Sequence, residues 1–236
     1  MGVRTALFDL DDTLFDHRHC AQAALAGVHA SHACFEALDQ ADLERRHAHI
    51  LEELHLEVLA RRLELDAARV ERFRRLYQWA GLEAGPELAA ATAAAYRDAY
   101  VAARREVRGA AALLAAVGRH MTVVIVSNNL LAEQQAKLRH CGLDRHVDVL
   151  VVSEEAGVSK PDPRIFEIAL ARAGGHPDDA VMVGDSWTND IEGARTAGVR
   201  AIWFNPEGKT PPDPGVATIR SLEPAGEVLR VILGLA

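Results

Sequence analysis

A short apolar segment near the beginning of the chain ends abruptly in a group of carboxylates. Residues 3–8 are mostly apolar and lack helical spacing, a pattern typical of a buried strand in a parallel sheet. Three aspartates and a hydroxyl follow directly: Asp9, Asp11, Asp12 and Thr13. Because open α/β sheets bind their ligands at the carboxyl ends of strands, this segment predicts a parallel sheet with a site at Asp9.

Asp9 and Asp11 are two positions apart, so their side chains point the same way in an extended chain. Two carboxylates at one site repel each other, and at least one of them then needs a cation or a proton. The pair therefore indicates either a metal site or a division of labour between a nucleophile and an acid. The alternative is an aspartate-rich turn after a strand, because Asp is common in turns.

The pattern over residues 16–105 is helical. Apolar residues recur at three- and four-residue steps between Leu43 and Val58, which predicts an amphipathic helix. Residues 87–103 are rich in alanine, a strong helix former, and they follow a break at Gly85-Pro86. We find no strand candidate in this part of the sequence.

After residue 121, short β-branched runs alternate with helical stretches. The runs are 122–126, 147–152, 180–183 and 199–204, and the helical stretches lie near 130–141, 163–173 and 191–197. This alternation predicts βαβ units and a doubly wound, Rossmann-like parallel sheet. The helical segment after the first strand is too long for a loop. We therefore expect an α/β core formed by residues 1–15 and 106–236, with an inserted all-helical domain at 16–105.

The composition, with 49% hydrophobic and 25% charged residues in 236, is ordinary for a globular protein. A formal net charge of -8 argues against binding to a nucleic-acid polymer. The cysteines Cys20, Cys34 and Cys141 form no CxxC pair, so we expect no disulfide framework and a cytoplasmic location. Without a membrane-length apolar run or room for a signal peptide, we expect no membrane partner. We expect the protein to be a monomer or a homodimer.

Polar residues also follow two of the later predicted strands. The run 122–126 stops at Ser127-Asn128, where a hydroxyl and backbone N–H groups beside a helix start suit an anionic oxygen. The alternative is a cap for the helix that follows. Lys160 lies in the loop after the next run, and Pro161 restricts the backbone just behind it.

The fourth polar group contains two more aspartates. Asp185 comes at the end of the run 180–183, and Asp190 lies five residues further on at an expected helix start. Hard oxygen ligands of this kind, with positions left for water and a phosphate oxygen, suit Mg²⁺. Asp190 is alternatively a helix cap, and the two roles are compatible.

In this order, the four groups resemble the motifs of the haloacid dehalogenase (HAD) superfamily: DxDxT, a strand-terminal Ser or Thr, a Lys and an acidic pair. They are matched here by Asp9/Asp11/Thr13, Ser127, Lys160 and Asp185/Asp190. The resemblance spans the whole core, and the helical insertion lies where that family carries a helical cap.

Within that family, four stretches resemble the phosphatase branch that includes pyrimidine 5′-nucleotidases and N-acylneuraminate 9-phosphatases. They are Phe8–Phe15, Ser153–Val158, Lys160–Phe166 and Val183–Ser186. The chain departs from those relatives at Asn129, where they usually carry glycine. A side chain at this position would narrow the phosphate pocket or contact the substrate.

The resemblance implies a role for each group. Asp9 attacks phosphorus to form an aspartyl-phosphate, and Asp11 protonates the leaving oxygen and later deprotonates water. Mg²⁺ is held by Asp9, Asp185 and the backbone carbonyl of Asp11. The expected phosphate-binding residues are Asp12, Thr13, Ser127, Asn128 and Lys160. Asp190 orients Lys160 or the waters of the metal.

Substrate choice is expected to depend on the helical insertion. Asp16, His17 and His19 follow the first motif and are candidates, together with Asn129, for contact with the substrate. The alternative for the first three is the polar start of a helix.

The expected function is a Mg²⁺-dependent phosphatase that acts on a small phosphorylated metabolite, either a nucleotide or a sugar phosphate. A 2-haloacid dehalogenase also uses an Asp nucleophile but needs neither the second carboxylate nor Mg²⁺, so Asp11 favours the phosphatase. A phosphomutase would keep the same site. A non-catalytic module would be indicated by loss of Asp9, Lys160 or Asp185, and all three are present.

Overall fold

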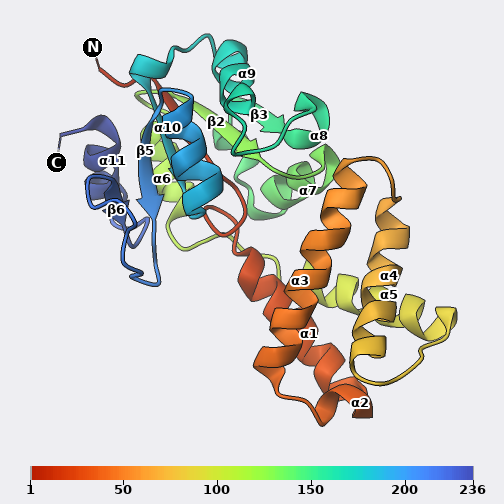
Figure 1. The fold of residues 1–236 in the computed structure, drawn as a ribbon. Coiled ribbons are helices and arrows are strands. Elements are labelled where there is room, and N and C mark those ends of the chain that lie inside the picture. Colours follow the sequence, from red (N-terminus) through yellow and green to blue (C-terminus); the bar gives the residue numbers. More distant parts are fainter. Residues whose placement is uncertain (1, 236) are drawn as a thin grey trace. The chain divides into compact units, whose positions relative to one another are not determined.

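The computed structural model describes residues 2–235, and the chain divides into two compact units (Figure 1). The first, which we call the sheet unit, consists of the chain up to Asp16 and from Arg105 onward. The second, the helical unit, is His17–Arg104. Asp16 and Arg105, the last and first residues of the two segments of the sheet unit, bind each other. The Asp16 N–H donates to the Arg105 carbonyl (3.1 Å), and the Arg105 Nε donates to the Asp16 carboxylate (2.8 Å).

Within the described residues, the sheet unit contains one six-stranded parallel sheet in the order β3-β2-β1-β4-β5-β6. The strands are β1 Thr5–Phe8, β2 Thr122–Ser127, β3 Val149–Val152, β4 Ala180–Gly184, β5 Arg200–Phe204 and β6 Ala217–Ile219. This confirms the predicted parallel sheet. β1 and β3 each begin two residues later than the apolar pattern suggested, because that pattern does not record where pairing with a neighbouring strand starts.

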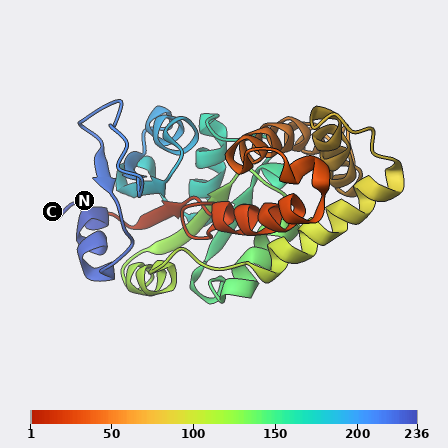
Figure 2. The same ribbon diagram turned by 90° about the horizontal axis from the view of Figure 1, so that it is seen from below.

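Helices cover both faces of this sheet, as a doubly wound fold requires. The helices are α6 Ala110–Val117, α7 Leu131–Cys141, α8 Ser153–Ala156, α9 Pro163–Ala173, α10 Gly193–Thr196 and α11 Ala225–Leu233, with the shorter turns η1 Asp144–His146 and η2 Pro177–Asp179. In Figure 2, α9 and α10 lie on one face, and α6, α7 and α11 lie on the other. A π-helical turn, η3 Trp187–Glu192, precedes α10. The helix expected near 191–197 therefore starts earlier, between the two aspartates of the fourth motif.

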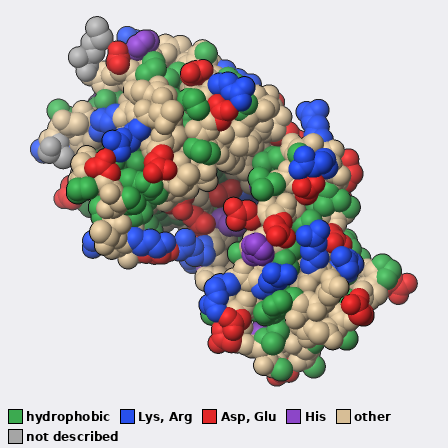
Figure 3. Space-filling model, viewed as in Figure 1, with side chains coloured by type: hydrophobic (Ala, Val, Ile, Leu, Met, Phe, Trp, Pro, Cys, Tyr) green, Lys and Arg blue, Asp and Glu red, His purple; other side chains and the backbone are tan. Residues whose placement is uncertain are grey.

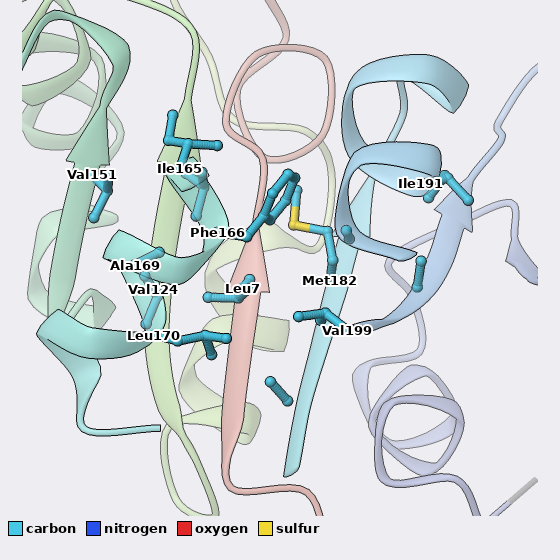
Figure 4. Packing of buried hydrophobic residues seen from close by; sticks show 14 of the residues in the cluster. Leu7, Val124, Val151, Ile165, Phe166, Ala169, Leu170, Met182, Ile191 and Val199 are labelled. Atoms are coloured by element: carbon cyan, nitrogen blue, oxygen red, sulfur yellow. The ribbon is translucent and has the colours of Figure 1, made fainter. Parts of the chain in front are cut away.

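The core between the sheet and α9 is formed by alternate residues of the strands, and the helices on the other face bury the rest. Leu7, Val124 and Met182 point from three neighbouring strands toward α9 (Figure 4). The helix contributes Ile165 and Phe166, and one turn later it adds Ala169 and Leu170 to the same stripe. Each large apolar side chain buried in this way contributes about 1.5–3 kcal/mol. The packing fixes the position of β1 relative to β2 and β4.

The helical unit is built from α1 His17–Ser31, α2 Ala33–Glu36, α3 Gln40–Leu59, α4 Leu65–Trp79 and α5 Pro86–Ala102. α3 begins after Asp39, whose side chain accepts the N–H of Asp42, and it buries the predicted apolar stripe. Among residues 2–235, no helix is long and apolar enough to cross a membrane. On the face shown in Figure 3, acidic and basic side chains are interspersed with apolar ones.

The strand order places β1 beside β4 at the centre of the sheet. From β1 the chain continues through β2 and β3 on one side, and then from β4 through β5 and β6 on the other. Ligands bind in open α/β sheets where the strand order reverses in this way. Phe8 is paired with Val183, so Asp9 and Asp185 emerge from neighbouring strands at the same edge.

Candidate active site

Asp9 and Lys160 form a buried ion pair at the end of β1. The Asp9 N–H donates to the Val183 carbonyl (3.0 Å), which extends the strand pairing to the aspartate. The Lys160 Nζ lies 2.6 Å from an oxygen of Asp9 and 2.6 Å from an oxygen of Asp190. All three side chains are at most 9% exposed. Charge-assisted bonds of this length are strong and hold both carboxylates in place.

Asp190 also bonds to the residue that caps its own turn, Ser186. Its second oxygen accepts the N–H of Ser186 (2.9 Å). The side chain packs directly on Gly184, where a built Cβ would lie 2.6 Å from the Asp190 Cβ and closer still to its carboxyl group. A side chain at position 184 would therefore displace Asp190. Asp190 therefore contacts both Lys160 and the start of its own turn, whose cap residue is Ser186.

Asp9, Asp185 and Asp190 each offer an oxygen within 4.8 Å of the others. Burial raises the pKa of Asp9 well above its usual range, and the charges of Asp190 and Asp185 raise it further against the opposing effect of Lys160. Burial lowers the pKa of Lys160, but attraction by Asp190 and Asp9 outweighs it, so the net shift is upward and the ammonium stays charged. Two of these carboxylates, those of Asp9 and Asp190, contact the Lys160 ammonium, and the third belongs to Asp185. The donor set and its excess negative charge suit a hard divalent cation.

The Asp11 side chain lies outside this carboxylate group. From the sequence, Asp11 was expected to bind the metal through its backbone carbonyl. Asp190 was expected to orient Lys160 or the waters of the metal without binding the metal itself. The three carboxylates that the structure brings together are those of Asp9, Asp185 and Asp190.

Thr13 connects the first and fourth motifs. Its fully buried hydroxyl accepts the N–H of Asp185 (3.1 Å) and lies 3.3 Å from Asp9 and 3.5 Å from the Asp185 carboxylate. The carbonyl of Asp185 accepts the indole N–H of Trp203 on β5 (2.8 Å). These bonds hold the loop after β4 against the loop after β1. Trp203 had no signal in the sequence beyond its place in an apolar strand.

The backbone at Asp12 makes a tight turn. Asp12 adopts a φ of 61°, in the left-handed region that non-glycine residues seldom occupy. Its N–H donates to the Phe15 carbonyl (2.7 Å), while the Leu10 carbonyl accepts the N–H groups of Leu14 and Phe15. The Asp12 N–H, which was expected to bind phosphate, donates here within its own loop.

Ser127 and Asn128 join the second motif to the third. Ser127 ends β2 and is 2% exposed. The Asn128 amide pairs with the Lys160 backbone in both directions, donating to its carbonyl (2.8 Å) and accepting its N–H (2.7 Å). This pairing fixes the backbone of Lys160 relative to the end of β2. Pro161 follows in a cis peptide bond, and Asp162 caps α9.

Asn129 stands where the phosphatases named in the sequence analysis usually carry glycine, and its side chain faces Asp11. Its Nδ2 lies 3.3 Å from an Asp11 oxygen, and its Oδ1 accepts the N–H of Leu130 just before α7. The side chain thus contacts the second aspartate of the first motif. Whether it also meets substrate stays a prediction.

Two residues of α7 were missed from the sequence. Lys137 binds both oxygens of Asp11, and Gln134 reaches both Asp11 and Ser127. Both side chains are buried. The available signal was their spacing of three, which places two polar residues on one face of a helix that follows the second motif.

The remaining candidates fall in different units. Asp16 lies in the sheet unit, bound to Arg105. His17 and His19 lie on α1 in the helical unit, where the His17 Nδ1 is 2.7 Å from the Tyr100 hydroxyl. Any role for these side chains in substrate choice stays a prediction.

Comparison with known proteins gives an independent view of the whole chain. A model of the haloacid dehalogenase-like hydrolases matches residues 3–198. The chain is 35% identical over 234 residues to phosphoserine phosphatase from Thermus thermophilus, covering 90% of this chain and 92% of that protein. It is 39% identical over 126 residues to the pyrimidine 5′-nucleotidase YjjG of Escherichia coli, covering 51% of this chain and 55% of the other.

A solved structure shares the complete fold. The HAD-hydrolase YfnB from Bacillus subtilis, in a magnesium-bound form, superimposes with a TM-score of 0.74 at 27% identity, covering 99% of both chains. That protein shows interdomain movement.

Proposed function

Because this chain belongs to the haloacid dehalogenase-like hydrolase family, we propose that it is a Mg²⁺-dependent phosphatase of small phosphate monoesters that works through an aspartyl-phosphate. The observation that carries the proposal is the arrangement at Asp9. This buried carboxylate ends the central strand, contacts Lys160 and shares a group of oxygens with Asp185 and Asp190. The likeness to a phosphatase from Thermus thermophilus over 90% of the chain supports phosphate chemistry.

Asp9 is the nucleophile in this proposal. One of its carboxylate oxygens forms a bond to phosphorus while the bond from phosphorus to the ester oxygen breaks. Water then attacks phosphorus, which releases inorganic phosphate and restores the carboxylate. Asp9 and Asp185, with the backbone carbonyl of Asp11, would hold the divalent cation. When bound, this cation supplies positive charge that ionises Asp9 and neutralises phosphoryl oxygens.

Asp11 is the acid and base. Its side chain is 25% exposed, against 9% for Asp9, so it is the more accessible of the two for proton exchange. It gives a proton to the leaving oxygen in the first step and accepts one from water in the second.

Lys160 and Ser127 are the strongest candidates for binding the phosphoryl oxygens, with the backbone N–H of Asn128 and the Thr13 hydroxyl beside them. Asp190 holds Lys160 in place from the opposite side. Asp12 is the weakest member of the set, because its N–H would first have to leave the Phe15 carbonyl.

We place substrate selection in the helical unit, which acts as a cap in this proposal. The unit is inserted a few residues after the loop that carries Asp9 and Thr13, and its first helix begins with His17 and ends its first turn near His19. The motif loops bind a phosphate group but offer little that would recognise a whole metabolite. The likeness to one phosphoserine phosphatase and one nucleotidase leaves several esters as candidates, among them phosphoserine and the nucleotide and sugar phosphates.

Two other reactions fit the same fold. A dehalogenase has no need for the second carboxylate, so the four contacts that Lys137, Gln134 and Asn129 make with Asp11 would be without purpose. A phosphomutase would require the aspartyl-phosphate to survive until a second substrate oxygen attacks it. Product analysis with a hexose phosphate distinguishes that reaction from hydrolysis.

The proposal is tested by measuring released phosphate from a panel of nucleoside monophosphates and sugar phosphates with Mg²⁺. At least one ester should be turned over by the wild-type protein and by Asp178→Asn, a control at a side chain that is 84% exposed. Asp9→Asn should release essentially none. Chloride release from a 2-chloroacid with no phosphate release from any ester would favour the dehalogenase instead.

A further inference from the structure

Lys137 makes a two-pronged ion pair with the second aspartate of the first motif. Its Nζ lies 2.6 Å from one oxygen of Asp11 and 2.8 Å from the other. The Lys137 side chain is 4% exposed, and its ammonium lies 5.2 Å from the centre of the Phe15 ring. The chain has three lysines, and two of them are buried in ion pairs with aspartates of the motifs: Lys137 with Asp11, and Lys160 with Asp9 and Asp190.

Stability of the fold does not account for a buried lysine here. Taking an ammonium out of water costs several kcal/mol, and its attraction to one carboxylate often only offsets that cost. An apolar residue of similar size on α7 would pack against the Phe15 ring at no such cost. What the lysine adds is a fixed position for both oxygens of Asp11.

Gln134 extends this contact to the second motif. Its Nε2 donates to an oxygen of Asp11 (2.9 Å) and to the hydroxyl of Ser127 (2.5 Å). An amide nitrogen carries two hydrogens, so both bonds can form at once. Because the Ser127 oxygen accepts from Gln134, its own hydrogen is free to donate in another direction, as a phosphate-binding hydroxyl must.

The orientation of the Gln134 amide is maintained at a cost. Its Oε1 is buried and has no hydrogen-bond partner among residues 2–235. An unsatisfied buried acceptor destabilises the folded state. Turning the amide over would aim its carbonyl oxygen at the Asp11 carboxylate, which is repulsive. The contacts to Asp11 and Ser127 therefore determine the orientation.

The two residues lie one turn apart on the same face of α7. That helix starts directly after the second motif, so one rigid element reaches both the aspartate that handles protons and the hydroxyl that binds phosphate. Fixing two reacting groups relative to each other is a large source of rate enhancement.

We propose that Lys137 and Gln134 are positioning residues, which hold the Asp11 carboxylate and the Ser127 hydroxyl in register for phosphoryl transfer. The proposal rests on the phosphatase function proposed above. Lys137 acts through Asp11 alone, whereas Gln134 acts through Asp11 and Ser127. The two substitutions should therefore produce different kinetic defects.

The test compares single-turnover rates of two esters in three variants. Glycerol phosphate has a leaving group that needs a proton, and p-nitrophenyl phosphate has one that needs little. Lys137→Met should slow cleavage of glycerol phosphate by about 10²-fold, the usual size of an acid–base contribution, and that of p-nitrophenyl phosphate by less than about tenfold. Lys137→Arg should recover part of the loss, because a guanidinium also binds a carboxylate with two bonds. Lys209→Met, at a lysine that is 65% exposed, is the matched control and should behave as wild type.

Inhibition by inorganic phosphate separates the two positions. Lys137→Met should leave the inhibition constant for phosphate within about twofold of the wild-type value, since Lys137 contacts Asp11 and none of the proposed phosphate-binding groups. Gln134→Leu should raise it by about tenfold, a loss of roughly one hydrogen bond of 1.4 kcal/mol. An unchanged inhibition constant also shows that the phosphate site is folded. Circular dichroism of every variant checks that the rest of the protein is folded. Should Lys137→Met not fold, Lys137→Gln takes its place in the same comparison.

Equal losses for both esters in Lys137→Met, or no recovery in Lys137→Arg, would overturn the proposal and leave Lys137 with a structural role. Wild-type phosphate binding in Gln134→Leu would overturn the part that concerns Ser127. A wild-type protein that cleaves neither these esters nor any of the panel would instead refute the proposed function, and the positioning roles with it.

Discussion

The ammonium of Lys160 lies 2.6 Å from an oxygen of Asp190, and neither side chain is more than 3% exposed. The third partner, Asp9, binds the same ammonium at the same distance. Lys160 therefore lies between the proposed nucleophile and a carboxylate that belongs to the helix after β4. The two carboxylates hold the ammonium between them.

Asp190→Asn tests this relationship. The amide keeps an acceptor for the Ser186 N–H but removes a negative charge beside Lys160, which retains only Asp9. We expect the free energy of unfolding to fall by about 1–3 kcal/mol, measured by urea denaturation, and turnover to fall by about tenfold or more. The exposed control Asp178→Asn should change neither. Wild-type turnover in Asp190→Asn would show that Lys160 is positioned without it.

Gly184→Ala should reproduce this defect while every charged side chain of the site is retained. The new Cβ would occupy the space of the Asp190 carboxyl group, and overpacking of a buried site costs about 1–3 kcal/mol. Gly226→Ala is the control, because a Cβ there meets nothing within 4 Å. We expect lower stability and activity only in Gly184→Ala, by thermal denaturation and by phosphate release. Full activity in Gly184→Ala would mean that Asp190 can move away without consequence.

Much of this arrangement could be predicted from sequence, because each motif follows a strand. The strands fixed which edge of the sheet Asp9, Ser127 and Asp185 share. What could not be predicted is contact made through helices. Lys137 and Gln134 are polar residues on a short helix, and nothing in their spacing alone separates a buried polar face from a solvated one. Their meaning depends on α7 lying against the first motif, which is a property of the folded chain.

The excess of carboxylates at the site predicts that the protein binds a metal even without substrate. Mg²⁺ should raise the melting temperature, because a ligand that binds only the folded state stabilises it. Asp185→Asn should abolish this shift, and Asp178→Asn should retain it. Exhaustive treatment with EDTA should abolish phosphate release, and added Mg²⁺ should restore it. Full activity after chelation would contradict the metal-dependent mechanism and favour dehalogenase chemistry.

The helical unit contains a buried histidine that makes stability depend on pH. Burial lowers the pKa of His47 well below its ordinary value of 6.5, and the positive charge of Arg72 on α4 and the neighbouring His17 on α1 lower it further. Its Nε2 has no hydrogen-bond partner among the described residues. The unfolded chain therefore takes up a proton near pH 6.5 that the folded chain takes up only at lower pH. The resulting stabilisation is present above pH 6.5 and is lost as the pH falls.

We expect the free energy of unfolding to decrease below pH 6.5 with a contribution from His47 of up to about 1.4 kcal/mol per pH unit. His47→Leu should remove that contribution, measured by urea denaturation between pH 7.5 and pH 5. His140→Gln, at an exposed position, is the control and should keep the wild-type slope. An identical slope in His47→Leu and wild type would show that His47 is not the group responsible.

The central claim is that Asp9 carries the phosphoryl group during turnover. It is tested most directly by quenching the wild-type protein in acid while it hydrolyses a good substrate with Mg²⁺, and mapping the phosphorylated peptide by mass spectrometry. The account predicts a phosphoryl group on Asp9 that is absent after EDTA treatment and absent in Asp9→Asn. A phosphoryl group on any other residue, or wild-type phosphate release by Asp9→Asn, would contradict it.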